Sequence, residues 1–173
     1  MEPLVHFVVP LVAFMLLGFD LRRSFLLSLL ALAPDLDALF LVHRSLTHSL
    51  MTLLGVSIPI LIAIYRLKPM ALKYGFMGLL SVASHIALDL PAGYTPVLWP
   101  LYNYSIWIQA ELSAHIGSAL TVALHLHMLT EPVSFEVAGS LDAPLFTGSG
   151  LIASLVVLAP FFVKRLEQRF RRA

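Results

Sequence analysis

Carboxylates and imidazoles recur at a few points of an otherwise apolar sequence, and their types suggest metal chemistry. The stretch APDLDALFLVHRSLTHS, residues 33–49, and the motif SHIALD, residues 84–89, carry most of them. Inserting one aspartate at the centre of a bilayer costs on the order of 3 kcal/mol, so three would cost about 9 kcal/mol without partners. A structural zinc ion contributes about 10–16 kcal/mol of apparent binding free energy. The residue types therefore favour a divalent metal site inside a membrane protein.

The spacing within each motif is compatible with ligands for one ion. His85 and Asp89 are four residues apart, so a helix presents both on one face with Cβ atoms about 6 Å apart. Pro34 interrupts the segment before it, which lets Asp35 and Asp37 point the same way in a turn. One of these two aspartates would bind the ion and the other would orient a histidine.

Each of these residues also has an ordinary structural role open to it. Asp35 could cap a helix that resumes at Leu36, with Asp37 as a favourable charge in its first turn. His85 and Asp89 could form a buried hydrogen-bonded pair without a metal. The metal interpretation is favoured because ionisable residues from several membrane helices are expected to meet, and such residues usually mark function.

Six apolar stretches could provide those helices. The chain of 173 residues is 59% hydrophobic and 12% charged, which is typical of a polytopic membrane protein. A spanning helix needs about 20 mostly apolar residues. The candidate stretches are residues 4–19, 24–42 (broken at Pro34), 50–67, 70–90, 106–129 and 151–163.

We therefore expect an all-α fold, a polytopic transmembrane bundle of about five to six helices. The chain forms a single integral membrane domain over residues 1–173, with the metal site in residues 1–105 and C-terminal helices with a basic tail in residues 106–173. If all six stretches cross the membrane, alternate helix ends share one side. The residues that fall toward that side are His6, Asp35, Asp37, His48, His85 and Asp89.

Composition excludes several other kinds of site. The net charge is +1 and the basic residues are scattered, so no nucleic-acid partner is expected. The absence of cysteine excludes disulfides and thiolate metal sites. No HExxH or GxSxG motif is present, which argues against a zincin protease and a serine esterase.

The ordered motifs resemble a known family. PDLD at 34–37, RSLTHS at 44–49, SHIALDL at 84–90 and VLWP at 97–100 are similar to the motif series of the YdjM-like inner-membrane proteins. The resemblance covers roughly residues 1–105. That family is associated with the LexA regulon in some bacteria and is regarded as a group of membrane-bound metal-dependent hydrolases. It is distantly similar to zinc-dependent phospholipase C and related nucleases, which are all-helical and hold zinc with histidine and aspartate.

The resemblance implies a location in the inner membrane and a divalent cofactor, most simply zinc, with manganese as the alternative. The implied ligands are Asp35 or Asp37, His48, His85 and Asp89, with His6 as a further ligand. The phospholipases take a second ligand set from a later histidine and glutamate. Glu111 and His115 have the corresponding spacing in reverse order, so they either form a second site or are a polar pair that bridges two helices.

The implied activity is hydrolysis of an ester or phosphoester, such as a lipid headgroup, by metal-activated water. The aspartate of the PDLD motif that does not bind metal would act as general base. Arg44 would hold a phosphate or extend to lipid headgroups, and Thr47 offers a hydroxyl beside His48. Trp99 would belong to an interfacial aromatic belt or stack on a substrate.

Two functions from other classes fit the same residues. A small transporter could use histidine and aspartate to carry protons or a cation, although residues 1–86 and 87–173 do not resemble each other as the halves of such transporters usually do. A membrane scaffold could use the ion only to hold its helices together.

Overall fold

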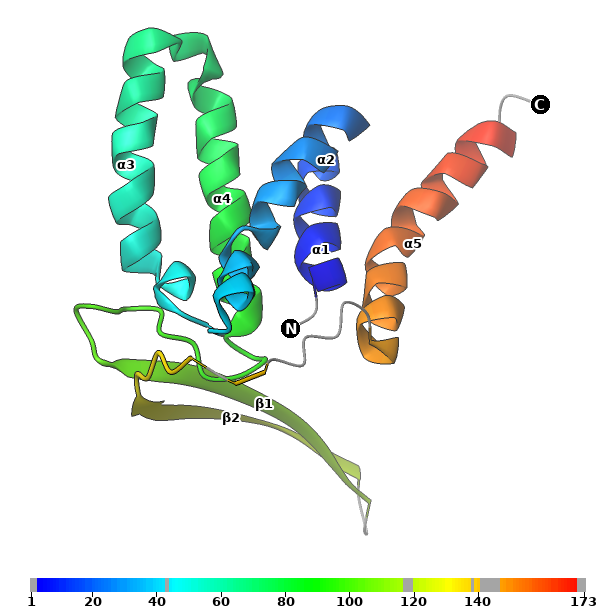
Figure 1. Ribbon diagram of the computed structural model, residues 1–173. Coiled ribbons are helices and arrows are strands. Elements are labelled where there is room, and N and C mark those ends of the chain that lie inside the picture. The colour runs from blue at the N-terminus through cyan, green and yellow to red at the C-terminus, as the bar shows by residue number, and fades with distance from the viewer. Residues whose placement is uncertain (1–2, 43, 117–119, 138, 141–146, 171–173) are drawn as a thin grey trace.

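The computed structural model describes residues 3–42, 44–116, 120–137, 139–140 and 147–170, with side chains as far as residue 163. Helices stand side by side and a two-stranded sheet runs across one of their ends (Figure 1). The longer elements in chain order are α1 (Pro3–Leu16), α2 (Leu21–Leu29), α3 (Leu50–Leu67), α4 (Leu72–Asp89), β1 (Tyr104–Ile116), β2 (Leu120–Pro132) and α5 (Gly148–Phe170). Short 3-10 helices join them: η1 (Leu30–Leu32), η2 (Pro34–Phe40), η3 (Leu46–His48) and η4 (Pro69–Ala71).

Helices α3 and α4 form an antiparallel pair that is long and apolar enough to cross a membrane. The two candidate spans are Leu50–Leu67 and Pro69–Asp89. The Ser49 hydroxyl caps α3 by accepting from the backbone N–H groups of Met51 and Thr52. Gly75 lets the two helices approach closely, since a Cβ there would lie 2.8 Å from Leu61 Cδ2.

The prediction of five to six spanning helices is wrong. Among the described residues only the α3 and α4 segments are long and apolar enough to span. Helix α1 has 14 residues, about 21 Å at 1.5 Å per residue, which is short of a hydrocarbon core of about 30 Å. The predicted segment 24–42 is α-helical only as far as Leu29 and continues as the 3-10 turns η1 and η2.

The prediction of an all-α fold is also wrong, because residues 106–129 form most of a β-hairpin instead of a fifth helix. Strands β1 and β2 pair antiparallel, with Tyr104 opposite Pro132 and Leu112 opposite Leu124. The segment YSIWIQAELSAHI alternates polar and apolar residues, which suits a strand with two unlike faces. Total apolar content hid this alternation, because a long apolar stretch satisfies the length criterion for a spanning helix whatever its period.

Small residues of α4 make its close contacts with the N-terminal helices. The buried Ser81 hydroxyl donates to the Leu27 carbonyl at 2.8 Å, and Gly78 lies against Leu30. Such contacts replace the hydrophobic driving force that helices lack in lipid. They hold the middle of α4 beside α2 and η1.

Candidate metal centre

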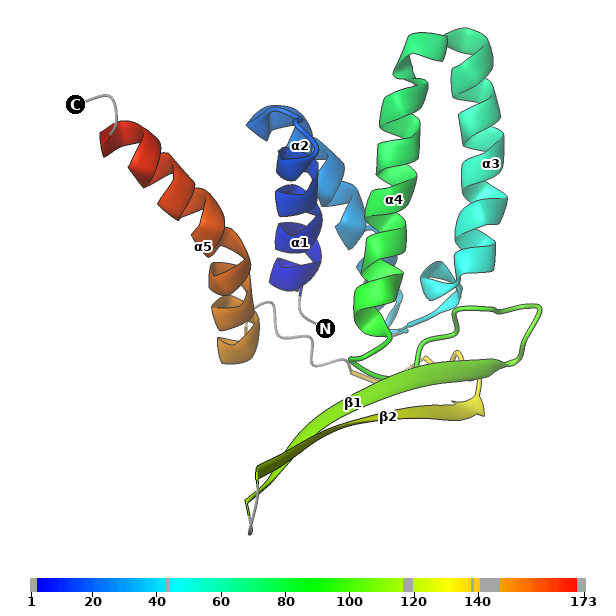
Figure 2. The same cartoon turned by 180° about the vertical axis from the view of Figure 1, so that it is seen from behind.

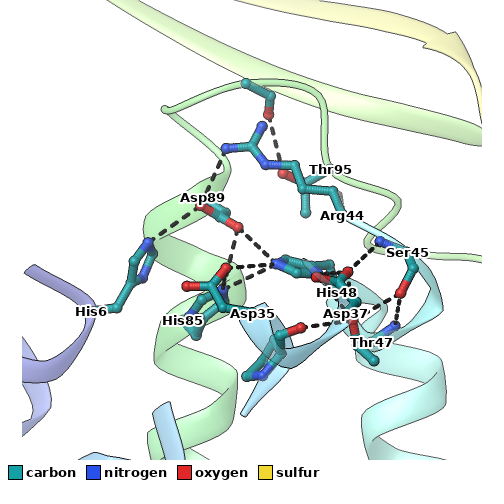
Figure 3. A network of polar contacts seen from close by, with 12 residues as sticks. His6, Asp35, Asp37, Arg44, Ser45, Thr47, His48, His85, Asp89 and Thr95 are labelled. Atoms are coloured by element: carbon teal, nitrogen blue, oxygen red, sulfur yellow. Dashed lines mark hydrogen bonds and ion pairs between the residues drawn. The ribbon is translucent and has the colours of Figure 1, made fainter. Parts of the chain in front are cut away.

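Four separate segments deliver histidines and aspartates to one end of the helix group (Figure 3). His6 comes from α1, Asp35 and Asp37 come from η2, and His48 ends η3, while His85 and Asp89 lie one turn apart at the end of α4. Their side chains are buried or nearly so, since Asp35 is 12% exposed and Asp89 is 1% exposed. The structure therefore brings together residues that are up to 83 positions apart (6 to 89) in the sequence.

Four ligand-type atoms face one another at the centre of this group. His48 Nε2 lies 3.1 Å from His85 Nε2. Asp89 Oδ2 lies 3.2 Å from His48 Nε2 and 3.4 Å from His85 Nε2. Asp35 Oδ1 lies 3.7 Å from His48 Nε2 and 3.6 Å from His85 Nε2.

These distances suit a tetrahedral metal ion. Ligand atoms about 2.0–2.1 Å from such an ion stand roughly 3.3 Å apart. The carboxylate oxygens Asp35 Oδ1 and Asp89 Oδ2 are buried and make no hydrogen bond with the described residues, although histidine nitrogens lie close to both. Buried carboxylate oxygens that converge with imidazole nitrogens and accept no hydrogen bond are the environment in which a cation replaces missing donors. The buried histidine and aspartate groups could therefore hold a metal ion.

The charge of the group also favours a cation. Three buried or nearly buried carboxylates, those of Asp35, Asp37 and Asp89, face the single guanidinium of Arg44 in this cluster. Three carboxylates and one guanidinium leave two negative charges, which protons on the histidines or a metal ion must compensate in this poorly solvated region. A divalent cation would neutralise them.

Asp37 does not face the four central atoms, and instead holds His48 from behind. Its Oδ2 accepts from the Ser45 backbone N–H at 2.8 Å and from the Thr47 hydroxyl at 3.0 Å, and lies 3.3 Å from His48 Nδ1. Burial raises the pKa of Asp37, but the bonds from His48 and Ser45 outweigh burial and hold that pKa below its ordinary value. This contact with Nδ1 leaves Nε2 of the ring directed at the centre.

The pKa of His48 indicates how strongly the surrounding carboxylates favour a positive charge. Burial lowers the pKa of His48, yet the carboxylates of Asp35, Asp37 and Asp89 outweigh burial and raise it to about 10. The carboxylates that keep a proton on this ring would also favour a metal ion in its place.

His6 and Arg44 contact the other oxygen of Asp89. Asp89 Oδ1 lies 3.4 Å from His6 Nε2 and 3.2 Å from Arg44 Nη2. The His6 ring also stacks on His85, with ring centroids 4.0 Å apart. His6 thus borders the central group. Two sets of three described residues could share an ion: Asp35, His48 and His85, and His6, His85 and Asp89.

A comparison with protein families agrees with this picture. A model of the YdjM inner membrane protein family matches residues 1–166. The chain belongs to this family. The YdjM resemblance that the motifs predicted is thereby confirmed, as is a location in the inner membrane. A search of the curated proteins gave no match, and neither did a search of the solved structures.

Other residues predicted for the site of this YdjM-family protein lie at different distances from its centre. The Thr47 hydroxyl, which bonds to Asp37 as described, also lies 3.1 Å from the Pro34 carbonyl, the other acceptor within its reach. Trp99 packs its ring against Phe135, with centroids 5.4 Å apart. Glu111 and His115 are exposed on β1, where four residues of strand span about 13 Å. The hairpin therefore removes the helical spacing on which a second metal site at this pair depended.

Sequence reasoning missed the backbone groups that support Arg44 and Asp37 in this YdjM-family protein. Arg44 Nη1 donates to the Tyr94 carbonyl at 3.2 Å, and its guanidinium lies over Gly93, where a Cβ would collide with it. Gly93, within PAGYTP, was a visible signal, because a glycine between prolines often marks a close approach of backbone. The Ser45 N–H that binds Asp37 left no trace in the residue types.

Proposed function

We propose that this protein is a metal-dependent hydrolase of the inner membrane that cleaves an ester or phosphoester, such as a lipid headgroup. The observation that carries the proposal is a buried group from His48, His85, Asp35 and Asp89, in which the two imidazole Nε2 atoms lie 3.1 Å from each other and 3.2–3.7 Å from an oxygen of each carboxylate. Two imidazoles and two carboxylates in this spacing favour zinc, whereas manganese usually takes six oxygen-rich ligands. A bound ion of this kind polarises ester oxygens and lowers the pKa of water to near neutrality.

The two aspartates of the PDLD motif would have different roles in the reaction. Asp35 is the most exposed of the three aspartates, and its Oδ2 makes no hydrogen bond with the described residues. This oxygen would accept a proton from the attacking water as general base. Asp37 is occupied with His48 and Ser45, so its role is to position His48 rather than to take the proton.

Arg44 would bind the substrate in addition to its contact with Asp89. Two of its nitrogens bond to Asp89 and to the Tyr94 carbonyl, and Nε has no hydrogen-bond partner among the described residues. That donor would hold an oxygen of a phosphoester and stabilise the negative charge that builds up on it.

An apolar pocket beside the site favours a lipid substrate over a soluble one. The pocket has a volume of about 440 Å³ and is lined by Leu36, Phe40 and Leu46, with Asp37 and Thr47 at its border. This size and lining suit part of an acyl chain. Asp37, which lines this pocket, contacts His48 of the candidate metal centre.

Metal analysis on matched variants tests the proposal. Purified wild-type protein should contain about one ion per chain that chelation removes, and it should release headgroups from phospholipid vesicles or cleave an ester or phosphodiester reporter. His85→Ala and Asp89→Asn should lose both metal and turnover while remaining in the membrane. His125→Ala, the same change on the exposed hairpin, should retain both.

Hydrolysis that persists in His85→Ala would contradict the proposal. A stoichiometric ion without turnover on any lipid or reporter would instead assign the group a structural role.

A further inference from the structure

The β1–β2 hairpin has one face that is apolar over most of its length. Residues directly opposite in an antiparallel pair share a face, and the register places Leu112 opposite Leu124 and Ala110 opposite Leu126. All even-numbered residues from 106 to 116 and from 120 to 128 therefore lie on one side, and every one is Ile, Leu, Val, Ala or Met. They are open to their surroundings, since Leu112, Leu124 and Met128 are 72%, 62% and 70% exposed.

The opposite face is mostly polar. Gln109 pairs with His127, Glu111 with His125, and His115 with Thr121 on that side. Beyond the Trp107–Leu129 pair at its base, the hairpin is thus a two-sided ribbon with one apolar and one mostly polar face. Such a ribbon suits a boundary between an apolar and an aqueous phase.

A hairpin of this kind is poorly suited to stand alone in water. Two-stranded sheets without a covering layer are at best marginally stable. Soluble proteins protect long free strand edges with lysine or proline, but no Lys or Arg occurs from residue 74 to residue 163. A second surface must therefore cover the apolar face.

The attachment of the hairpin places it where the chain leaves the membrane. The Ile108 N–H donates to the Leu90 carbonyl at 3.0 Å, directly after the span that ends at Asp89. Ile106 exchanges two backbone hydrogen bonds with Thr95, each 2.9 Å long. Both views show the hairpin crossing the ends of the helices and extending toward the α5 side (Figures 1 and 2).

We propose that the apolar face of the β1–β2 hairpin lies on the lipid leaflet at the metal-site end of the protein. The hairpin is hydrogen-bonded to Leu90, the residue that follows the α4 span, and its apolar face has no charge to desolvate. The depth is limited, because the outer edge of β2 has unpaired backbone groups that the hydrocarbon core cannot satisfy. The hairpin therefore rests at headgroup level, with its polar face toward water, and does not span.

Single-cysteine labelling tests the placement directly, since the chain has no cysteine of its own. The variants Leu124→Cys and Leu112→Cys probe the apolar face. Ala123→Cys and Ser113→Cys are their neighbours on the polar face and serve as matched controls. Each full-length variant carries an environment-sensitive fluorophore in phosphatidylcholine nanodiscs, and quenching by iodide in water is compared with quenching by lipids spin-labelled near the headgroup.

Labels at 112 and 124 should be quenched by the lipids and roughly threefold less by iodide than labels at 113 and 123. Two positions on each strand keep the comparison valid if one variant folds poorly. Equal iodide quenching on both faces would overturn the proposal. Protection from both quenchers, with energy transfer between labels on different chains, would overturn it in favour of a second copy of the hairpin. None of these readings depends on metal or hydrolysis, so the proposed enzyme function can fail separately.

Discussion

At the scale of single residues, the two aspartates of the PDLD motif have different tasks although they are two positions apart. The 3-10 turn η2 directs Asp35 Oδ1 to within 3.7 Å of His48 Nε2 and Asp37 Oδ2 to within 3.3 Å of His48 Nδ1. One carboxylate thus faces the centre and the other faces the back of the same imidazole. The spacing predicted this division of labour but could not say which aspartate has which task.

Asp37→Asn should weaken metal binding without abolishing it. The amide cannot hold the His48 ring as the carboxylate does, and the loss of such an outer partner typically costs about 10- to 100-fold in metal affinity. Asp35→Asn removes a ligand itself and should cost more. Competition titrations with a chelating dye would measure both, and equal losses in the two variants would contradict the assignment.

Gly93→Ala should destabilise the Arg44–Asp89 contact from the backbone side. The added methyl group would collide with Arg44 Nη1, and Arg44 Cζ lies only 3.3 Å away. Displacing the guanidinium leaves Asp89 with less compensation, a change expected to cost about 1–3 kcal/mol of unfolding free energy. Gly18→Ala is the matched control, because Gly18 also has a positive φ and nothing lies within 4 Å of a Cβ there. Detergent-mediated unfolding of both variants gives the comparison.

At the scale of elements, a predicted helix was correct where the length of the apolar stretch and the period of its apolar residues both indicated a helix. It was wrong where the length indicated a helix but the period indicated a strand. Residues 50–67 are long, apolar and capped by Ser49, and they form α3 with those bounds. Residues 106–129 are less apolar, because they include Glu111 and three histidines, and they alternate with a period of two and form most of β1 and β2. The metal-site residues could be predicted because their types and motifs are unusual in lipid. The hairpin could not, because backbone pairing between 104 and 132 is invisible to a search for apolar length.

The contact between α4 and α2 has its own prediction. Ser81→Ala removes the hydrogen bond to the Leu27 carbonyl and should lower the unfolding free energy by about 0.6–1.7 kcal/mol. Ser84→Ala, three residues along the same helix, removes only a bond to the Ser81 carbonyl within α4. Its effect should be smaller. Unfolding in mixed micelles measures both, and an equal loss would mean that the interhelical bond contributes nothing of its own.

At the scale of the whole molecule, the two spans fix which parts of the chain share a side of the membrane. Helix α3 begins beside the histidine–aspartate group of the candidate metal centre, and α4 returns to it. The turn between them, which includes Lys68, therefore lies at the far end (Figure 2). The 18 residues of α3 extend about 27 Å, close to the thickness of a hydrocarbon core. If α3 and α4 cross the membrane, the histidine–aspartate group and the hairpin share one side, and Lys68 lies on the other.

Cysteines introduced at Lys68 and Ala92 should consequently react from opposite sides of the membrane. Both positions are exposed, and Ala92 follows α4 by three residues. In inside-out and right-side-out vesicles, a membrane-impermeant maleimide should label one variant in each preparation, because a polar turn containing lysine does not remain in hydrocarbon. The cysteine-free parent chain gives the background. Labelling of both variants from the same side would mean that α3 and α4 do not cross, and the metal group would then have to lie at a surface instead of at the end of two spans.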